Sequence, residues 1–236
     1  MGAAPVIAAT PVLIPGNMCD GRLWAAQVRA ALPGFVDADT TADANIEGMA
    51  RRALALVEGQ LLPVGFSMGG IVALEIARIA PERIVGLVLI DTNASADLPE
   101  RAAARPRQQD QVLGGELDRL MIEELKPNYL AEANRGDPRL HELLLGMALE
   151  LGEDVFVAQS EALRTRRDLR DVVAAMDVPI LLACGSEDRL CPPEWHRKLA
   201  QNAKHATLNV INGAGHMLPL EQPEKLAASI EAWRMQ

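Results

Sequence analysis

Short apolar runs rich in β-branched residues alternate along the chain with segments whose apolar residues recur every three or four positions. The strand-like runs lie at 12–16, 35–38, 61–66, 83–92, 178–185 and 206–213. The helical segments follow Asp20 and lie at 46–57, 69–80, 193–202 and 223–234. Strands that alternate with helices predict an α/β fold, with a mostly parallel sheet of about six strands flanked by helices.

One residue conflicts with this pattern. Pro63 stands inside the apolar run 61–66, which should form a central strand. Proline has no N–H to donate to a strand ladder and is usually found at an edge, a strand start or a bulge. We therefore expect Pro63 at the beginning of its strand, with a short strand after it.

The pattern changes between Thr92 and Met176. This stretch is richer in Arg, Glu and Asp, has weaker strand signals and is typical of several helices. Because this stretch lies between two core strands, it predicts an inserted helical cap at 93–176, with a core formed by 1–92 and 177–236. Inside it, the run 164–171 mixes both charge signs, and we expect it to be a solvated helix face.

Composition narrows the function classes. The net charge of -9 argues against nucleic acid and anionic membranes as partners, since phosphate binding needs clustered Lys and Arg. The apolar opening 1–16 has no basic residue before Arg22, which favours a strand over a secretion signal, and no apolar run is long enough to span a membrane. Three cysteines without metal-ligand or disulfide spacing (Cys19, Cys184 and Cys191) are typical of the reducing cytoplasm. We expect a cytoplasmic protein with no metal and no organic cofactor.

The stretch GFSMG at 65–69 is a candidate catalytic motif. Ser67 follows a predicted strand and precedes a predicted helix, which is the context of a G-x-S-x-G nucleophile elbow. Such a turn forces unusual backbone angles on the serine, and the flanking glycines leave room where neighbouring chains pass closely. An ordinary tight turn would explain the same residues, so the motif needs partners elsewhere in the chain.

A serine nucleophile needs a base, and the chain has 4 histidines. His196 and His205 lie in or beside a polar helical stretch and are expected at the surface. His141 lies in the inserted segment without a catalytic motif around it. His216 follows the last predicted strand on a glycine-rich loop, from which its side chain can reach the sheet. His216 is therefore the candidate base.

The base in turn needs a carboxylate that fixes its tautomer. Two aspartates stand at predicted strand ends, Asp91 and Asp188. We favour Asp188 because it gives the order Ser, Asp, His along the chain, the order found in α/β-hydrolases. Asp91 is then expected to be structural, holding the start of the cap, and Glu187 is expected to point away from the base.

Taken together, these stretches resemble the α/β-hydrolase superfamily, close to its small bacterial esterases and lactonases. The matching stretches are LIPGNMCDGRLW, GFSMGGIVALEIA, PERIVGLVLIDT, GSEDRLCPP and GAGHMLPLEQPE. They extend from Leu13 to Glu224. The resemblance implies the fold and a catalytic triad of Ser67, His216 and Asp188, in agreement with the assignments above.

The resemblance also implies an oxyanion hole with two backbone N–H donors. One belongs to Met68, the residue after the nucleophile, and the other to Asn17, in the loop after the first core strand. The pocket is expected between the elbow and the cap, with Met18 and Trp24 near it, although packing between helix and sheet explains Trp24 equally well. With one Tyr and three Phe in the chain, walls of Leu, Met and Ala are expected, which suggests an apolar substrate group.

These observations predict a serine hydrolase that cleaves a small carboxylic ester, thioester or lactone through an acyl-enzyme. The same triad supports C–C hydrolysis, cyanohydrin cleavage or perhydrolysis, and a non-catalytic ligand receptor is the alternative from another class. Haloalkane dehalogenation is disfavoured because that chemistry uses a carboxylate where Ser67 stands. The expected partner is a small ester-type molecule, and the sequence indicates no oligomeric state.

Overall fold

A computed structural model describes residues 9–235 of the protein. The first eight residues of the segment 1–16, which was expected to form a strand, lie outside the described residues. Within residues 9–235, six strands form one sheet in the order β2-β1-β3-β4-β5-β6, and every neighbouring pair is parallel. The strands are β1 (Thr10–Ile14), β2 (Val36–Asp37), β3 (Leu61–Phe66), β4 (Leu87–Ile90), β5 (Ile180–Gly185) and β6 (Ala206–Ile211). The predicted fold class is confirmed.

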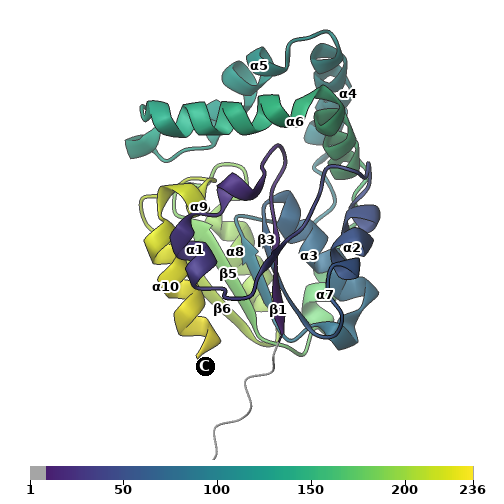
Figure 1. The fold of residues 1–236 in the computed structure, drawn as a ribbon, viewed down its shortest axis with the longest axis vertical. Helices are drawn as coiled ribbons and strands as arrows, with labels where there is room; N and C mark the ends of the chain where they lie inside the picture. The colour runs from purple at the N-terminus through teal and green to yellow at the C-terminus, as the bar shows by residue number, and fades with distance from the viewer. Residues whose placement is uncertain (1–8, 236) are drawn as a thin grey trace, which may run out of the picture.

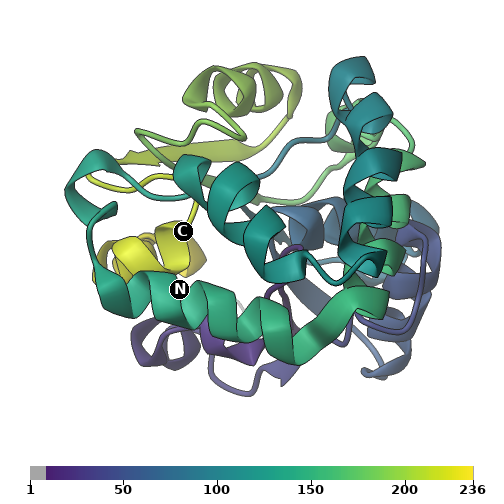
Figure 2. The same ribbon diagram turned by 90° about the horizontal axis from the view of Figure 1, so that it is seen from above.

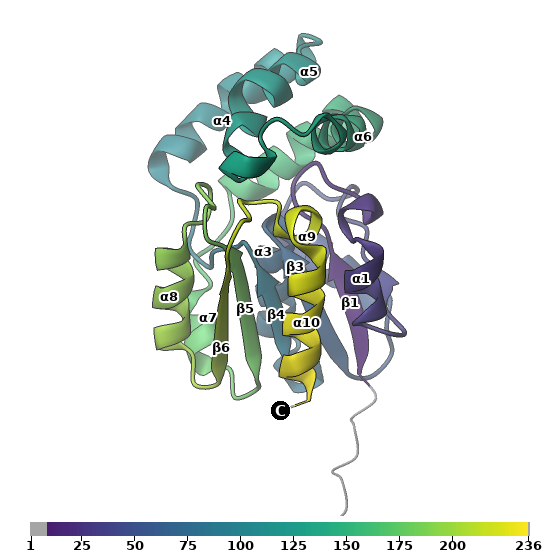
Figure 3. The same ribbon diagram turned by 90° about the vertical axis from the view of Figure 1, so that its left-hand side faces the viewer.

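Helices cover both faces of the sheet (Figures 1 and 3). On one face lie α1 (Ala26–Ala30) and α10 (Pro223–Arg234), which contact each other. The other face carries α2 (Ile46–Ala55), α3 (Met68–Ile79), α7 (Arg170–Ala175) and α8 (Pro193–Asn202). The helix expected after Asp20 is broken: Asp20 caps the short helix η1 (Gly21–Leu23), and α1 follows separately.

Successive side chains of a strand point to opposite faces of the sheet, so the apolar core consists of two clusters, one on each face. In β1, Leu13 belongs to the cluster on the α1 and α10 side, while Val12 and Ile14 belong to the cluster on the α2 and α3 side. All three side chains are fully buried. Burial on both faces explains why these strands are continuous apolar runs instead of alternating ones.

The expectation for Pro63 is wrong. It is the third residue of the six-residue strand β3 and is paired with Val12 of β1. On the other side of β3, Leu61 pairs with Ile84 and the regular ladder resumes only where Val64 pairs with Val88. Between these two pairs, β3 advances by three residues and the neighbouring segment by four, so the neighbouring segment has one extra residue. The missing N–H falls within this irregularity, where a regular strand pair would have needed a donor.

The segment between β4 and β5 forms most of the upper part of the molecule (Figures 1 and 2). Its elements are α4 (Pro99–Leu113), α5 (Leu117–Leu120), η3 (Met121–Leu125), η4 (Lys126–Asn128), η5 (Glu132–Asn134) and α6 (Pro138–Arg164). The long helix α6 is kinked at Gly152, whose φ is 83°. The last helix before β5, α7, contacts α3 and α8 beside the sheet instead of lying with the others.

The short elements η2 (Pro81–Arg83) and α9 (Leu218–Glu221) complete the described chain. Within residues 9–235, no helix combines the length and the apolar composition that crossing a bilayer requires.

Candidate active site

Ser67 occupies the sharp turn between β3 and α3. Its backbone has φ 51° and ψ -115°, a conformation that is costly for a residue with a side chain. The turn is held by the Ser67 N–H, which donates to the carbonyl of Ile90 at 2.9 Å. The neighbouring glycines are required by close approach: a Cβ on Gly65 would lie 2.2 Å from the carbonyl oxygen of Gly69, and one on Gly69 would lie 2.0 Å from that of Ile14.

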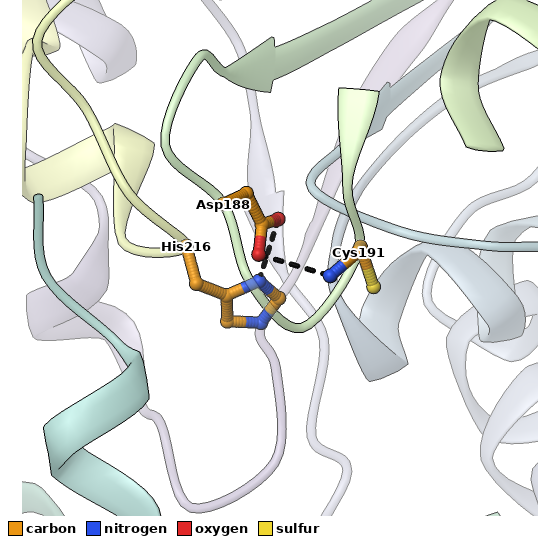
Figure 4. A group of neighbouring side chains, drawn as sticks. All are labelled: Asp188, Cys191 and His216. Atoms are coloured by element: carbon orange, nitrogen blue, oxygen red, sulfur yellow. Dashed lines mark hydrogen bonds and ion pairs between the residues drawn. The ribbon is translucent and has the colours of Figure 1, made fainter. Parts of the chain in front are cut away.

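The structure brings Ser67, His216 and Asp188 into one hydrogen-bonded line. Nε2 of His216 lies 3.0 Å from Oγ of Ser67, and Nδ1 lies 2.9 Å from Oδ2 of Asp188. Figure 4 shows Asp188 between His216 and Cys191. The imidazole can accept a proton from the hydroxyl at one nitrogen while the carboxylate orients the other, which is the arrangement that activates a serine.

Asp188 is held in place by its own loop. Oδ1 accepts hydrogen bonds from the N–H groups of Leu190 at 2.8 Å and Cys191 at 2.9 Å, which leaves Oδ2 for His216. Burial alone would raise the pKa of Asp188, but the charge of His216 and these hydrogen bonds outweigh it and hold the pKa below its usual range. Asp188 is therefore a carboxylate at neutral pH.

Asp91, which was expected to hold the start of the cap, has a different structural role. It is fully buried at the end of β4, where it accepts the N–H of Gly185 at 2.9 Å and that of Leu218 at 3.3 Å. It therefore ties β4 to the ends of the segments that carry Asp188 and His216, and not to the start of the cap. Burial, and after it the charge of Asp188, raise the pKa of Asp91 well above its usual value.

One expectation for the remaining histidines is wrong. His196, expected at the surface, is fully buried, and its Nε2 accepts the N–H of Thr92 at 3.1 Å. Burial lowers the pKa of His196, so it is a neutral structural group. His205 is exposed, and His141 contacts the carbonyl of Arg135 within the inserted segment. Glu187 accepts the N–H of Glu132 at 2.9 Å.

The two candidate oxyanion donors line the same cavity as Ser67. Met68 is the first residue of α3, so its N–H has no acceptor within the helix. Asn17 lines the cavity from the loop after β1. Their role as donors stays a prediction.

Sequence reasoning missed a residue that holds this loop. Gln159 of α6 is fully buried, and its Oε1 accepts the backbone N–H of Met18 at 2.8 Å and the side-chain amide of Asn17 at 3.1 Å. Its Nε2 donates to the carbonyl of Thr40 at 3.2 Å. No local signal identifies a glutamine in a long helix as such a contact, because the two partners are more than 140 positions away.

The cavity above Ser67 has a volume of about 240 Å³, with walls from both the core and the inserted segment. Met18 and Trp24, expected near it, are not among its lining residues, since both are buried in the apolar cluster that also contains α1 and α10. The wall contains the expected residue types, with three Leu, two Met and one Ala, but it also includes Arg101, Arg105 and Arg166.

Arg166 corrects another expectation, since it belongs to the charged run predicted to be a solvated helix face. Arg166 is only 8% exposed, and it lines the cavity. Arg164 and Arg167, its neighbours in the run, are exposed as expected.

Asp188, Cys191 and His216 also have the donor types of a metal site. Among the described residues, their ligand atoms lie within 4.8 Å of one another. However, both ring nitrogens of His216 already have partners in Ser67 and Asp188. Burial raises the pKa of the Cys191 thiol far above neutrality, so the thiolate that binds metals is disfavoured. The cluster fits proton transfer better than metal binding.

The family model described as "Alpha/beta hydrolase family" matches residues 12–229, and the chain belongs to this family. It is similar to a pimeloyl-[acyl-carrier protein] methyl ester esterase of Methylococcus capsulatus, with 30% identity over 240 residues that cover 93% of this chain and 92% of the relative. The predicted membership of the superfamily is thereby confirmed.

Solved structures agree with this assignment. A thermophilic esterase from Thermogutta terrifontis, solved with malate bound, has a TM-score of 0.86 and 29% identity, and the match covers 96% of this chain and 89% of that one. The enol-lactonase from Burkholderia xenovorans LB400 has a TM-score of 0.81 over 97% of this chain and 92% of its own, but at 20% identity it shares only the fold. The predicted likeness to small bacterial esterases is confirmed.

Proposed function

We propose that this protein is a serine hydrolase that cleaves a small carboxylic ester, thioester or lactone through Ser67, His216 and Asp188. The observation that carries the proposal is the line of hydrogen bonds from Ser67 Oγ to His216 at 3.0 Å and from His216 to Asp188 at 2.9 Å. The relatives named as esterases support ester hydrolysis as the reaction class.

In the acylation step, Oγ of Ser67 attacks the ester carbonyl carbon while Nε2 of His216 takes the hydroxyl proton. Asp188 stabilises the imidazolium and keeps the ring in place. The carbonyl oxygen becomes an oxyanion, which the N–H groups of Asn17 and Met68 would stabilise. When the intermediate collapses, His216 returns its proton to the departing alcohol, thiol or ring oxygen, and the acyl group stays on Ser67.

In the second step, water attacks the acyl-enzyme. His216 takes a proton from the water and then gives it to Oγ of Ser67, which releases the carboxylic acid and restores the site. No group other than the substrate and water is consumed. The three side chains therefore suffice for a complete cycle without a cofactor.

The inserted segment 93–176 would act as the cap of this site. Residues of α4, η3 and α6 contribute to the wall of the cavity opposite Ser67. Closing the cavity from above excludes bulk water and shapes the space for the substrate. A reducing compartment such as the cytoplasm is supported by three cysteines that are all buried and unpaired.

The proposal is tested with a fluorophosphonate probe and p-nitrophenyl butyrate. Wild-type protein is expected to be labelled by the probe and to turn over the ester, whereas Ser67→Ala should lose both. Ser229→Ala is the matched control, because Ser229 lies on α10 and does not line the cavity. Full labelling of the Ser67→Ala variant would refute the proposal. Tight binding of an ester by the wild type without turnover would instead favour a receptor.

A further inference from the structure

The cavity above Ser67 is rich in positive charge although the whole chain carries a net charge of -9. Three arginines line it: Arg101 and Arg105 from α4, and Arg166 after α6. Glu124 is the one carboxylate that lines it among the described residues, and it is paired with Arg107 at 2.6 Å. The balance of charge facing the cavity is therefore positive.

Two of these arginines share one carboxylate. Asp97, whose side chain is 1% exposed, lies 2.7 Å from Nε of Arg105 and 2.9 Å from Nη1 of Arg166. The Arg166 side chain is 4% exposed. Burial lowers the pKa of Arg166, but a guanidinium stays protonated in proteins. Two cations around one anion leave an excess positive charge beside the cavity, and an uncompensated buried charge is costly.

Arg101 adds a second unbalanced charge. Within the described part of the chain, no carboxylate lies within 4.0 Å of its guanidinium. Its Nη2 donates to the carbonyl of Leu190 at 3.1 Å, and its guanidinium carbon lies 5.7 Å from the ring centre of Trp195. Leu190 also donates its N–H to Asp188, so Arg101 is attached to the loop that carries the catalytic carboxylate. A guanidinium has five N–H donors, so most of those of Arg101 are left for a ligand.

From these contacts we propose that the cavity binds esters that carry a carboxylate, such as half-esters of small dicarboxylic acids. Arg101 is the specificity-determining residue, and the pair of Arg105 and Arg166 supplies further positive charge. The inference rests on the proposed function, because the bound ester must reach Ser67. A cavity of about 240 Å³ is small for a ligand site and favours a short, compact substrate. Guanidinium groups recognise planar carboxylates through paired hydrogen bonds.

The test compares two esters of the same length. Monoethyl glutarate carries the carboxylate, and ethyl 4-carbamoylbutanoate replaces it with a neutral amide. We expect the wild type to prefer the acid, and Arg101→Gln to lower the ratio of the two kcat/KM values by about 10- to 100-fold, the range for lost charge-assisted hydrogen bonds. Half-esters from malonate to adipate then locate the best chain length.

Arg119→Gln is the matched control, since it removes the same charge from an exposed position on α5 that does not line the cavity. It should leave the ratio unchanged. Glutarate and inorganic phosphate are then compared as inhibitors of p-nitrophenyl butyrate hydrolysis. We expect glutarate to inhibit more strongly. Stronger inhibition by phosphate would contradict carboxylate recognition.

Failure of this inference and failure of the proposed function give different results. If p-nitrophenyl butyrate is hydrolysed by Ser67 but the ratio for the glutarate pair is the same in wild type and Arg101→Gln, the carboxylate subsite is refuted and the hydrolase remains. If the wild type hydrolyses neither p-nitrophenyl butyrate nor any half-ester, both proposals are refuted.

Discussion

Replacement of Gln159 by leucine should damage catalysis from a distance. Gln159 belongs to α6 and does not line the cavity, yet its Oε1 accepts the N–H of Met18 at 2.8 Å and the amide of Asn17 at 3.1 Å. Met18 has φ 52°, so this loop has an unfavourable backbone conformation that its surroundings must hold. Leucine fills a similar volume but offers no acceptor.

The expected magnitude follows from these contacts. Met18 is 1% exposed, so its N–H would be left buried without a partner, which costs about 1–3 kcal/mol in the free energy of unfolding. If the loop relaxes instead, the N–H of Asn17, the proposed oxyanion donor, moves away from the position of the oxyanion. Loss of one oxyanion donor lowers kcat by about 10²–10³-fold, which sets the upper limit for Gln159→Leu.

The assay is burst kinetics with p-nitrophenyl butyrate, which separates acylation from deacylation, together with urea denaturation. Gln159→Glu is the conservative variant, because a protonated carboxyl at this buried site keeps an acceptor for Met18 and a donor for Thr40. It should recover most of the acylation rate that Gln159→Leu loses. Thr40→Val removes only the side-chain hydroxyl contact with Gln159, at 3.4 Å, and should alter stability more than kcat.

The reasoning would be refuted if Gln159→Leu lost stability while keeping the wild-type acylation rate. Such a result would show that Gln159 only joins α6 to the core, and that the loop of Asn17 keeps its position without it.

Three further changes test the site and its support. Asp188→Asn should lower kcat for p-nitrophenyl butyrate by about 10⁴-fold, because an amide facing His216 favours the wrong ring tautomer. Gly69→Ala should cost at least about 1–3 kcal/mol in urea denaturation, because its Cβ would lie 2.0 Å from the carbonyl oxygen of Ile14. In the wild type, the unfolded chain releases the Asp91 proton above about pH 4 while the folded protein retains it, so the free energy of unfolding falls as pH rises. Asp91→Asn removes this group and should flatten the pH dependence of stability above about pH 4.

Two of these changes, Gly69→Ala and Asp91→Asn, have a matched control. Gly146→Ala in α6 adds a Cβ with no atom within 4 Å and should not destabilise the protein, and equal losses in both glycine variants would contradict the close-approach argument. Asp171→Asn changes an exposed carboxyl and should keep the wild-type pH slope. A stability profile for Asp91→Asn parallel to that of the wild type, or near-normal kcat for Asp188→Asn, would contradict the respective assignment.

Several expectations could be formed from the sequence because they depend on local chemistry. Apolar runs of strand length and the three- to four-residue period of the helices predicted the order of the elements. The elbow around Ser67 was recognisable because its two glycines and its position between strand and helix are demanded by the turn itself. His216 was found by elimination among 4 histidines, each with a different local context.

The failures concern contacts that form only when distant segments meet. Met18 and Trp24 lie close to Asn17 in sequence, but both are buried in an apolar cluster assembled from distant segments and do not line the cavity. His196 has polar neighbours on its helix and is nevertheless buried against Thr92. Composition predicted walls of Leu, Met and Ala, which are present, but it did not indicate that three arginines also line the cavity.

The sequence by itself determined the elements, their parallel arrangement and the identity of the residues able to carry the chemistry, because hydrophobic period, turn geometry and side-chain type are local properties. Only the tertiary structure decided which of these residues meet. Arg166 lies in a run of charges with no feature that marks it, and it becomes part of a cavity wall because α6 returns toward the core beside Asp97. Burial, and the electrostatic cost that accompanies it, depend on every segment that surrounds a group, and these segments are far apart in the chain.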